Sequence, residues 1–146
     1  MNLSKLLGLK LKDDEMLDVL EENGIEEVVY EFDRTHENMP DLYWAGAKKE
    51  GFLLRFNQHQ ICDAVFCYIE PSEGYNKINP ELIGVTTYGS FASAEQECKR
   101  LNLSYSVAKP EMQRSWLRID DGPFRRHFQF KGGALFRVTL SAHGRQ

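Results

Sequence analysis

Two stretches share one pattern and decide the expected fold: YWAGAKKEGFLLRFNQHQICDAVFCYI at residues 43–69 and SWLRIDDGPFRRHFQFKGGALFRVTL at residues 115–140. Each stretch contains three apolar, β-branched or aromatic runs, separated by short turn segments such as KKEG, NQHQ, DDGP and KGG. Runs of this kind joined by tight turns predict three antiparallel strands in a meander. The sequence therefore indicates that one structural unit occurs twice, in pattern rather than in residue identity.

The segments that precede the two meanders also correspond. In the first half, Asp13 or Asp14 is placed to cap a helix that stops at Gly24, and a strand is expected over residues 25–32. In the second half, Ser90 or Ser93 is placed to cap a helix that ends near Asn102, and the alternating LSYSVA predicts a strand. Each half therefore reads as a helix followed by an antiparallel meander.

The expected fold class is α+β, with two pseudo-symmetric helix-plus-antiparallel-meander halves forming one compact domain over residues 1–146. The first half spans residues 1–70 and the second spans residues 81–146. The segment PSEGYNKINP at residues 71–80 is rich in Pro, Gly and Asn, which predicts a linker between them. A unit of about 65 residues is only marginally stable alone, so the halves must share a core. Their sheets would either pair edge to edge or stack, and the sequence leaves both arrangements open.

Composition places the chain among ordinary globular proteins, with 42% hydrophobic and 27% charged residues. We read no signal peptide and no apolar stretch of membrane-spanning length, so a cytoplasmic location is expected. The three cysteines Cys62, Cys67 and Cys98 fit buried thiols in a reducing compartment better than a disulfide framework. The odd spacing of Cys62 and Cys67 in one strand predicts that they lie on opposite faces and do not share a metal. No metal or cofactor is expected.

The usual enzyme signatures are absent, including phosphate-binding loops, zinc-protease motifs and the nucleophile elbow. The glycine pair in KGG is better explained as a hairpin turn that needs positive φ. Among the histidines His36, His59, His127 and His143, we single out His127, because strand alternation places it on one face with Arg125. This pair fits an anion site, but a cross-strand partnership with Asp120 or Asp121 is the preferred interpretation. We therefore do not expect an enzyme.

Charge is distributed unevenly along the chain, whose formal net charge is −4. Residues 1–41 contain twelve Asp or Glu against four Lys or Arg, whereas residues 42–146 contain ten against fourteen. This asymmetry predicts one acidic face and one mildly basic face. The basic residues are too sparse for a typical nucleic-acid binder, so direct nucleic-acid binding is not expected.

A resemblance to a known class of proteins rests mainly on the second half. The segments ELIGVTTYGSFASAEQECKRLN, WLRID and HFQFKGGALFRVTL, with the acidic helix and aromatic strands before them, resemble small bacterial immunity proteins of contact-dependent and polymorphic toxin systems. Many of those proteins are built from duplicated helix-plus-meander units. The likeness extends over nearly the whole chain and is architectural. The chain lacks the GlyGly-containing opening of one large immunity superfamily, so that group is not the match.

The resemblance implies a non-enzymatic protein that binds a toxin domain made by the same cell and occludes its active site or substrate groove. A toxin with a basic groove, such as a nuclease or another nucleic-acid-modifying enzyme, would suit an acidic surface. Tyr30 and Tyr43 are candidate aromatic anchors, with Trp44 and Tyr75 as further candidates if exposed. For Trp44 and Trp116, core packing is the preferred interpretation. The acidic candidates for partner binding are Glu21, Glu22, Glu26, Glu27, Glu31 and Asp33.

Two other functions remain open. A cytosolic chaperone or adaptor would bind a secreted effector by strand addition to an exposed sheet edge. A small enzyme or ligand-binding domain would instead use a deep polar cleft near His127 and Arg125.

Overall fold

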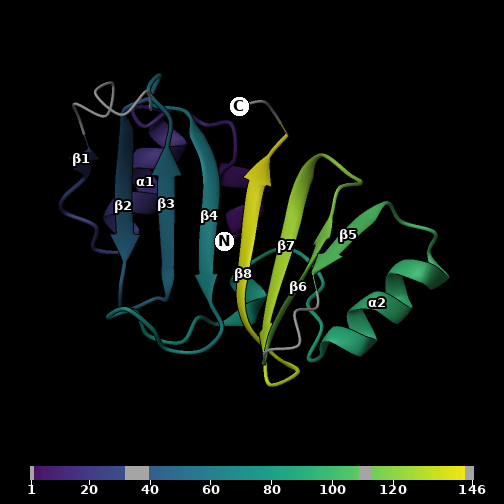
Figure 1. The fold of residues 1–146 in the computed structure, drawn as a ribbon. Coiled ribbons are helices and arrows are strands. Elements are labelled where there is room, and N and C mark those ends of the chain that lie inside the picture. Colours follow the sequence, from purple (N-terminus) through teal and green to yellow (C-terminus); the bar gives the residue numbers. More distant parts are fainter. Residues whose placement is uncertain (1, 32–39, 109–112, 144–146) are drawn as a thin grey trace.

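The computed structural model describes residues 2–31, 40–108 and 113–143. Within these residues the chain forms two α-helices and an eight-stranded antiparallel sheet, with the strands in the order β1-β2-β3-β4-β8-β7-β6-β5 (Figure 1). The predicted α+β class and the antiparallel meanders are therefore confirmed.

The elements follow the expected order along the chain. The first half contains the short 3-10 helix η1 (Leu3–Leu6), α1 (Asp14–Glu22), β1 (Val29–Glu31), β2 (Leu42–Ala47), β3 (Phe52–Phe56) and β4 (Cys62–Tyr68). The second half contains the 3-10 helix η3 (Pro80–Leu82), α2 (Phe91–Arg100), β5 (Tyr105–Ala108), β6 (Arg114–Ile119), β7 (Phe124–Lys131) and β8 (Ala134–Ala142). Of the strand expected over residues 25–32, residues 29–31 form β1 and residue 32 lies outside the described residues. Residues 25–28 form a connection instead of strand, anchored by the Ile25 amide, which donates to the Leu20 carbonyl (2.8 Å).

Local signals set the helix boundaries. Ser90 caps α2 by accepting a hydrogen bond from the Ser93 amide, and the Ser93 hydroxyl reciprocates at the Ser90 backbone. Asp13 is the N-cap residue of α1, although its carboxylate accepts from the Lys10 amide rather than from the helix. Gly24, with φ of +66°, follows the end of α1.

The two groups of strands join edge to edge. Strand β4 pairs with β8, bringing Val65 opposite Leu140 and Cys67 opposite Val138. Edge-to-edge pairing is therefore the arrangement observed, and the buried side chains of both halves belong to one hydrophobic cluster.

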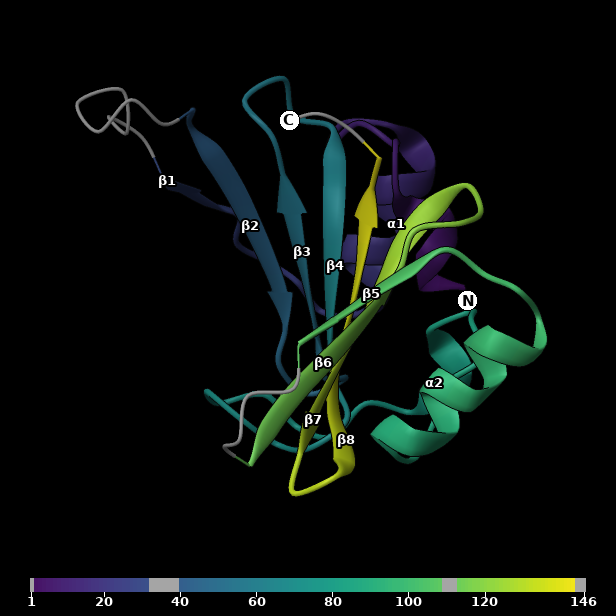
Figure 2. The same ribbon diagram turned by 45° about the vertical axis from the view of Figure 1, so that its right-hand side comes forward.

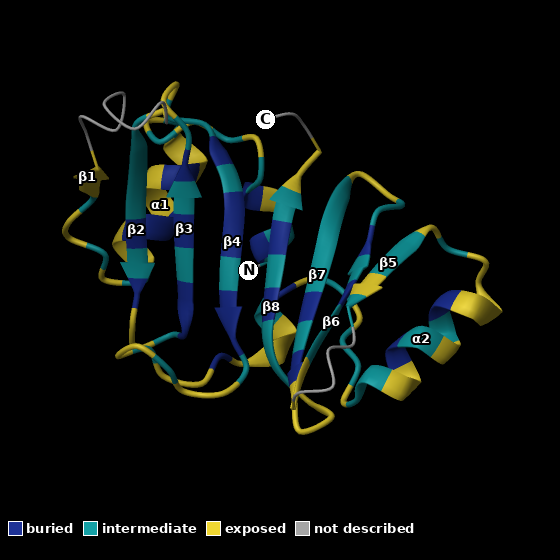
Figure 3. Cartoon of the chain, viewed as in Figure 1, coloured by how far each residue is buried: buried dark blue, intermediate teal, exposed yellow. Residues whose placement is uncertain are grey.

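One face of the sheet carries this core. The directly paired row Leu117, Phe128, Val138, Cys67 and Phe52 crosses five strands, and every member is fully buried. Buried residues of α1 and α2 pack in the same cluster. Both helices lie on the same side of the twisted sheet when Figures 1 and 2 are compared, and Figure 3 shows buried and half-buried residues alternating along the strands.

A bulge changes the expected placement of the cysteines. The register shifts between Arg55 and Phe56, so Cys62 lies opposite Phe56 while Cys67 lies opposite Phe52. Both thiols therefore lie on the core face, and the prediction that they occupy opposite faces was wrong, because the extra residue of a bulge resets the alternation. The three cysteines are free and buried, as expected.

The segment predicted as a linker packs against the strands of the first half. The Ile78 side chain is 1% exposed, and its amide donates to the Tyr68 carbonyl (2.8 Å). The ring of Tyr75 stacks on that of Tyr68, with centroids 4.5 Å apart. At Gly51, which has φ of +87°, an added Cβ would lie 2.4 Å from the Asn76 carbonyl oxygen, so only glycine fits.

Candidate functional site

The sheet face opposite the helices is the principal candidate surface, and we call it the uncovered face. Its directly paired row Arg118, His127, Thr139, Phe66 and Leu53 is half-buried throughout, in contrast to the fully buried row on the core face. Side chains on one side of paired strands share a face. The larger members of the uncovered face are Trp44, Leu53, Arg55, Phe66, Tyr68, Arg114, Trp116, Arg118, Arg125, His127, Gln129, Lys131 and Arg137, and Tyr68 is covered by Tyr75.

The first half of this face holds a cluster of aromatic and charged groups. The Arg55 Nε bonds to Asp63 Oδ1 at 2.9 Å, and its guanidinium lies 5.9 Å from the centroid of the Phe66 ring. The Trp44 ring is 6.0 Å from that of Phe66. The Trp44 Nε1 donates to Glu31 at 3.3 Å. These contacts hold the aromatic side chains in place on the surface.

A second cluster lies on β6 and β7. Two guanidiniums approach one carboxylate: Arg118 Nε lies 2.8 Å and Arg125 Nε 3.6 Å from Asp120 Oδ1. The predicted ion pairing of Arg125 with Asp120 is therefore confirmed. The Trp116 ring contacts His127 edge to face. Burial, and secondarily the charge of Arg118, lower the pKa of His127 from its usual value of 6.5, so that its imidazole is neutral at pH 7.

Arg137 lies between the two clusters. Its guanidinium is 4.9 Å from the centroid of the Tyr68 ring and 5.8 Å from that of Phe136. It also bonds to Glu73 of the segment before η3, at 3.1 Å. Cation–π contacts of this kind favour arginine over lysine.

The preference for core packing of the two tryptophans was wrong. Trp44 and Trp116 are half-buried and do not belong to the hydrophobic core cluster. Their neighbours Ala45 and Leu117 point into the core instead, because successive residues of a strand face opposite sides. The alternation of side chains along a strand predicts that each tryptophan and its neighbour face opposite sides of the sheet. Which of these sides faces the helices depends on the assembled sheet.

The predicted acidic residues lie mainly elsewhere. Glu21 and Glu22 end α1 on the helix side of the sheet, Glu26 and Glu27 follow in the connection to β1, and all four are exposed. Glu31 lies on β1 and bonds to Trp44 at the border of the uncovered face. Asp33 lies outside the described residues.

The two predicted tyrosine anchors contact each other. Tyr30 of β1 stacks on Tyr43 of β2, with ring centroids 4.7 Å apart. The Tyr30 hydroxyl donates to Asp41 at 2.7 Å, and this bond is the main cause that raises its pKa to about 12. Tyr43 packs partly against the core, whereas Tyr30 is exposed. Of the two, Tyr30 is therefore the more accessible to a partner.

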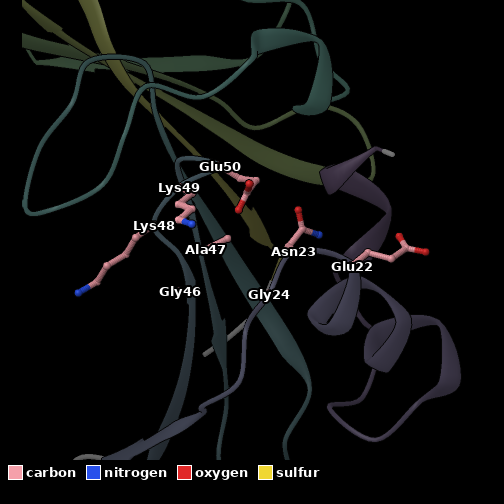
Figure 4. Close-up of a pocket in the computed structure, with 8 residues that line it drawn as sticks. All are labelled: Glu22, Asn23, Gly24, Gly46, Ala47, Lys48, Lys49 and Glu50. Carbon is pink, nitrogen blue, oxygen red and sulfur yellow. The ribbon is translucent and has the colours of Figure 1, made fainter.

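A hollow of about 460 Å³ lies between the end of α1 and the turn from β2 to β3 (Figure 4). It is lined by Glu22, Asn23, Gly24 and residues 46–50. The side chains of Glu22 and Lys48 extend away from each other, so the charged groups do not converge on one point. A second hollow is lined by residues of η1, Pro123, Phe124 and His143. His127 lines neither hollow.

The described residues contain no group of three or more His, Cys, Asp or Glu side chains arranged to hold a metal ion. His59 is exposed in a turn, and His143 lies 2.9 Å from the Gly122 carbonyl oxygen, while His36 is outside the described part of the chain. In the same described part, no helix combines the length and the apolar character that crossing a membrane requires.

Comparison with known proteins does not assign this chain to a family. No family model, no curated protein and no solved structure matches this chain.

Proposed function

We propose that this protein is a non-enzymatic immunity protein that binds a toxin domain made by the same cell and occludes its active site in the cytoplasm. The observation that carries the proposal is the uncovered face, on which Trp44, Trp116 and several arginines are displayed across a continuous sheet. Tryptophan, tyrosine and arginine are the residues that contribute most to binding energy at protein interfaces. The architectural resemblance to immunity proteins supports the same reading.

The size of the uncovered face suits a protein partner. Eight strands about 4.8 Å apart span about 34 Å, and strands of about six residues are about 20 Å long, which corresponds to an area of about 700 Å². A stable protein interface buries about 800 Å² on each partner. Tyr75 and Glu73 cover part of this face at Tyr68 and Arg137, so the area left for a partner is smaller than this estimate and suits a modest protein interface.

The face is also held rigid before binding. Its side chains stand on paired strands, and Arg55, Arg118 and Arg137 are fixed by ion pairs with Asp63, Asp120 and Glu73 respectively. A surface that is ordered in advance loses less side-chain entropy on association. This favours tight, stoichiometric binding.

The acidic residues supply a second surface for the same partner. Glu21, Glu22, Glu26 and Glu27 are exposed, and the proposal assigns them to attract a toxin with a basic groove, such as a nuclease. Complementary charge mainly accelerates encounter rather than adding affinity. In this scheme the uncovered face provides the anchors and the acidic residues provide steering.

We further propose that the two halves arose by duplication. In both halves a 3-10 helix leads to a glycine with positive φ (Gly8 at +92° and Gly84 at +87°), then to an α-helix and four antiparallel strands. The β4–β8 pair at the centre supports this origin, since each half then completes the sheet of the other.

Growth rescue tests the proposal. The protein is co-expressed with the product of the adjacent upstream gene, and protection from growth arrest is expected. The double variant Trp44→Ala/Trp116→Ala should lose protection while remaining folded by circular dichroism. The matched control Leu17→Ala/Leu101→Ala removes two exposed apolar side chains, one on α1 and one on the residue that follows α2, and should protect fully.

Two results would oppose the proposal. Arrest that the wild-type protein does not relieve would contradict the function itself. Binding to the neighbouring gene product without protection would favour the chaperone or adaptor instead.

A further inference from the structure

The uncovered face has a strongly charged part that the proposed function does not by itself explain. Its β6–β8 side displays five cations, and we call this set the basic strip: Arg114, Arg118, Arg125, Lys131 and Arg137. Among the described residues, only two carboxylates, those of Asp120 and Glu73, form ion pairs with the strip. The strip therefore has an excess of positive charge in a protein whose overall charge is negative.

At one end of the strip, hydrogen-bond donors exceed acceptors. Arg118 and Arg125 both direct their Nε toward the same oxygen of Asp120. Each guanidinium carries five N–H donors, so one carboxylate leaves most of them unbonded. Within the described residues, neither arginine bonds to another carboxylate. A second carboxylate could therefore bind here without displacing Asp120.

At the other end, two like charges face each other. Arg114 of β6 lies directly opposite Lys131 of β7, and both are exposed. Neither forms an ion pair with a described residue, and Arg114 lies 5.5 Å above the Phe136 ring. Like charges directly opposite in a sheet destabilise it slightly, so an anion bound between them would be stabilising.

On β6 and β7 the middle of the strip is uncharged, whereas Arg137 of β8 lies opposite Gln129 and is ion-paired to Glu73. Between the two ends lie Trp116, Gln129 and His127, whose lowered pKa keeps it neutral. The distance from Arg125 to Lys131 along β7 is about 20 Å, since the six intervening steps each advance about 3.4 Å. An extended segment of about six residues has this length.

We propose that the basic strip binds an acidic segment of the partner protein, with one carboxylate at Arg118 and Arg125, another at Arg114 and Lys131, and an apolar side chain over Trp116. This inference rests on the proposed function and specifies the chemistry of the partner. A protein segment fits better than a nucleic acid, because a strand with a phosphate at every nucleotide would also place charges beside Glu73 and over the uncharged Trp116, Gln129 and His127.

Titration with poly-L-glutamate, about 20 residues long to exceed the span of the strip, tests the proposal. The Trp44→Phe background leaves Trp116 as the only tryptophan, so its fluorescence reports binding at the strip. Saturable binding is expected. Both Arg114→Gln/Lys131→Gln and Arg118→Gln/Arg125→Gln should weaken it by about five-fold or more, because each pair is assigned to one carboxylate.

The control Lys48→Gln/Lys49→Gln removes the same charge from the exposed β2–β3 turn and should change binding by less than about two-fold, as expected for remote surface charges. Absence of binding, equal weakening by the control, or tighter binding of single-stranded thymidine oligonucleotide of the same length would overturn the inference. Growth protection is measured separately. Protection by the wild-type protein without poly-glutamate binding rejects the acidic segment alone, whereas failure of the wild-type protein to protect rejects the function.

Discussion

The rings of Trp116 and His127 meet edge to face on the uncovered face, with centroids 5.1 Å apart and planes at 86°. The contact joins neighbouring strands β6 and β7, and Arg118 lies directly opposite His127 in the same ladder. An uncharged imidazole is thereby placed among arginines.

This arrangement predicts a specific dependence of stability on pH. The folded protein holds the pKa of His127 below 6.5, so as pH falls below 6.5 the unfolded chain binds a proton that the folded chain does not. The free energy of unfolding should therefore decrease on acidification through that window. His127→Gln should reduce this slope, measured by urea unfolding between pH 7.5 and pH 5. His59→Gln, at an exposed turn, is the control; equal slopes in wild type and His127→Gln would contradict the prediction.

Substitutions at two glycines allow the destabilisation caused by steric contact to be measured apart from that caused by backbone strain. Gly51 and Gly74 share φ of +87°, but an added Cβ meets the backbone of Asn76 and Ile78 only at Gly51. Gly74→Ala should destabilise the protein by about 1 kcal/mol through strain alone. Gly51→Ala should lose about 1–3 kcal/mol more, because backbone atoms cannot move aside as a side chain can. Chemical denaturation of both variants measures the difference, and equal losses would show that residues 71–80 do not pack tightly on the turn.

The three cysteines should resist alkylation in the folded protein. Burial raises the pKa of the Cys62 and Cys67 thiols to about 12 and also raises that of Cys98. Since only the thiolate reacts, iodoacetamide at pH 8 should label none of them until the chain unfolds. Intact-mass spectrometry with and without urea counts the labels. Rapid modification without urea would show that the core opens locally.

The acidic residues can be tested independently of the uncovered face. Reversing Glu21, Glu22, Glu26 and Glu27 to Lys should slow association with the proposed toxin partner and flatten the dependence of that association on salt. The dissociation rate should change little if these residues only attract the partner electrostatically before contact. Stopped-flow or surface-based kinetics at several salt concentrations provides the measurement. Unchanged association would show that these residues do not face the partner.

Much of the fold could be predicted from local pattern. Ser90 as a helix cap, Gly24 beyond a helix end, and the glycines of the KGG turn each act within a few residues, so their effects are visible in the sequence. The strands of both meanders were predicted for the same reason, since alternation and turn residues are local signals. The pairing of Arg125 with Asp120 was also accessible, because five residues across a tight turn bring them together.

Contacts between distant residues decided the rest. The sequence by itself determined where strands, turns and helices form, because these depend on neighbours along the chain. Only the tertiary structure decided that β4 pairs with β8, that a bulge turns both Cys62 and Cys67 inward, and that both helices cover the same face. The placement of both helices on one face determines which of the alternating side chains are buried. It leaves Trp44 and Trp116 on the surface, because side chains on the face without helices remain accessible to solvent.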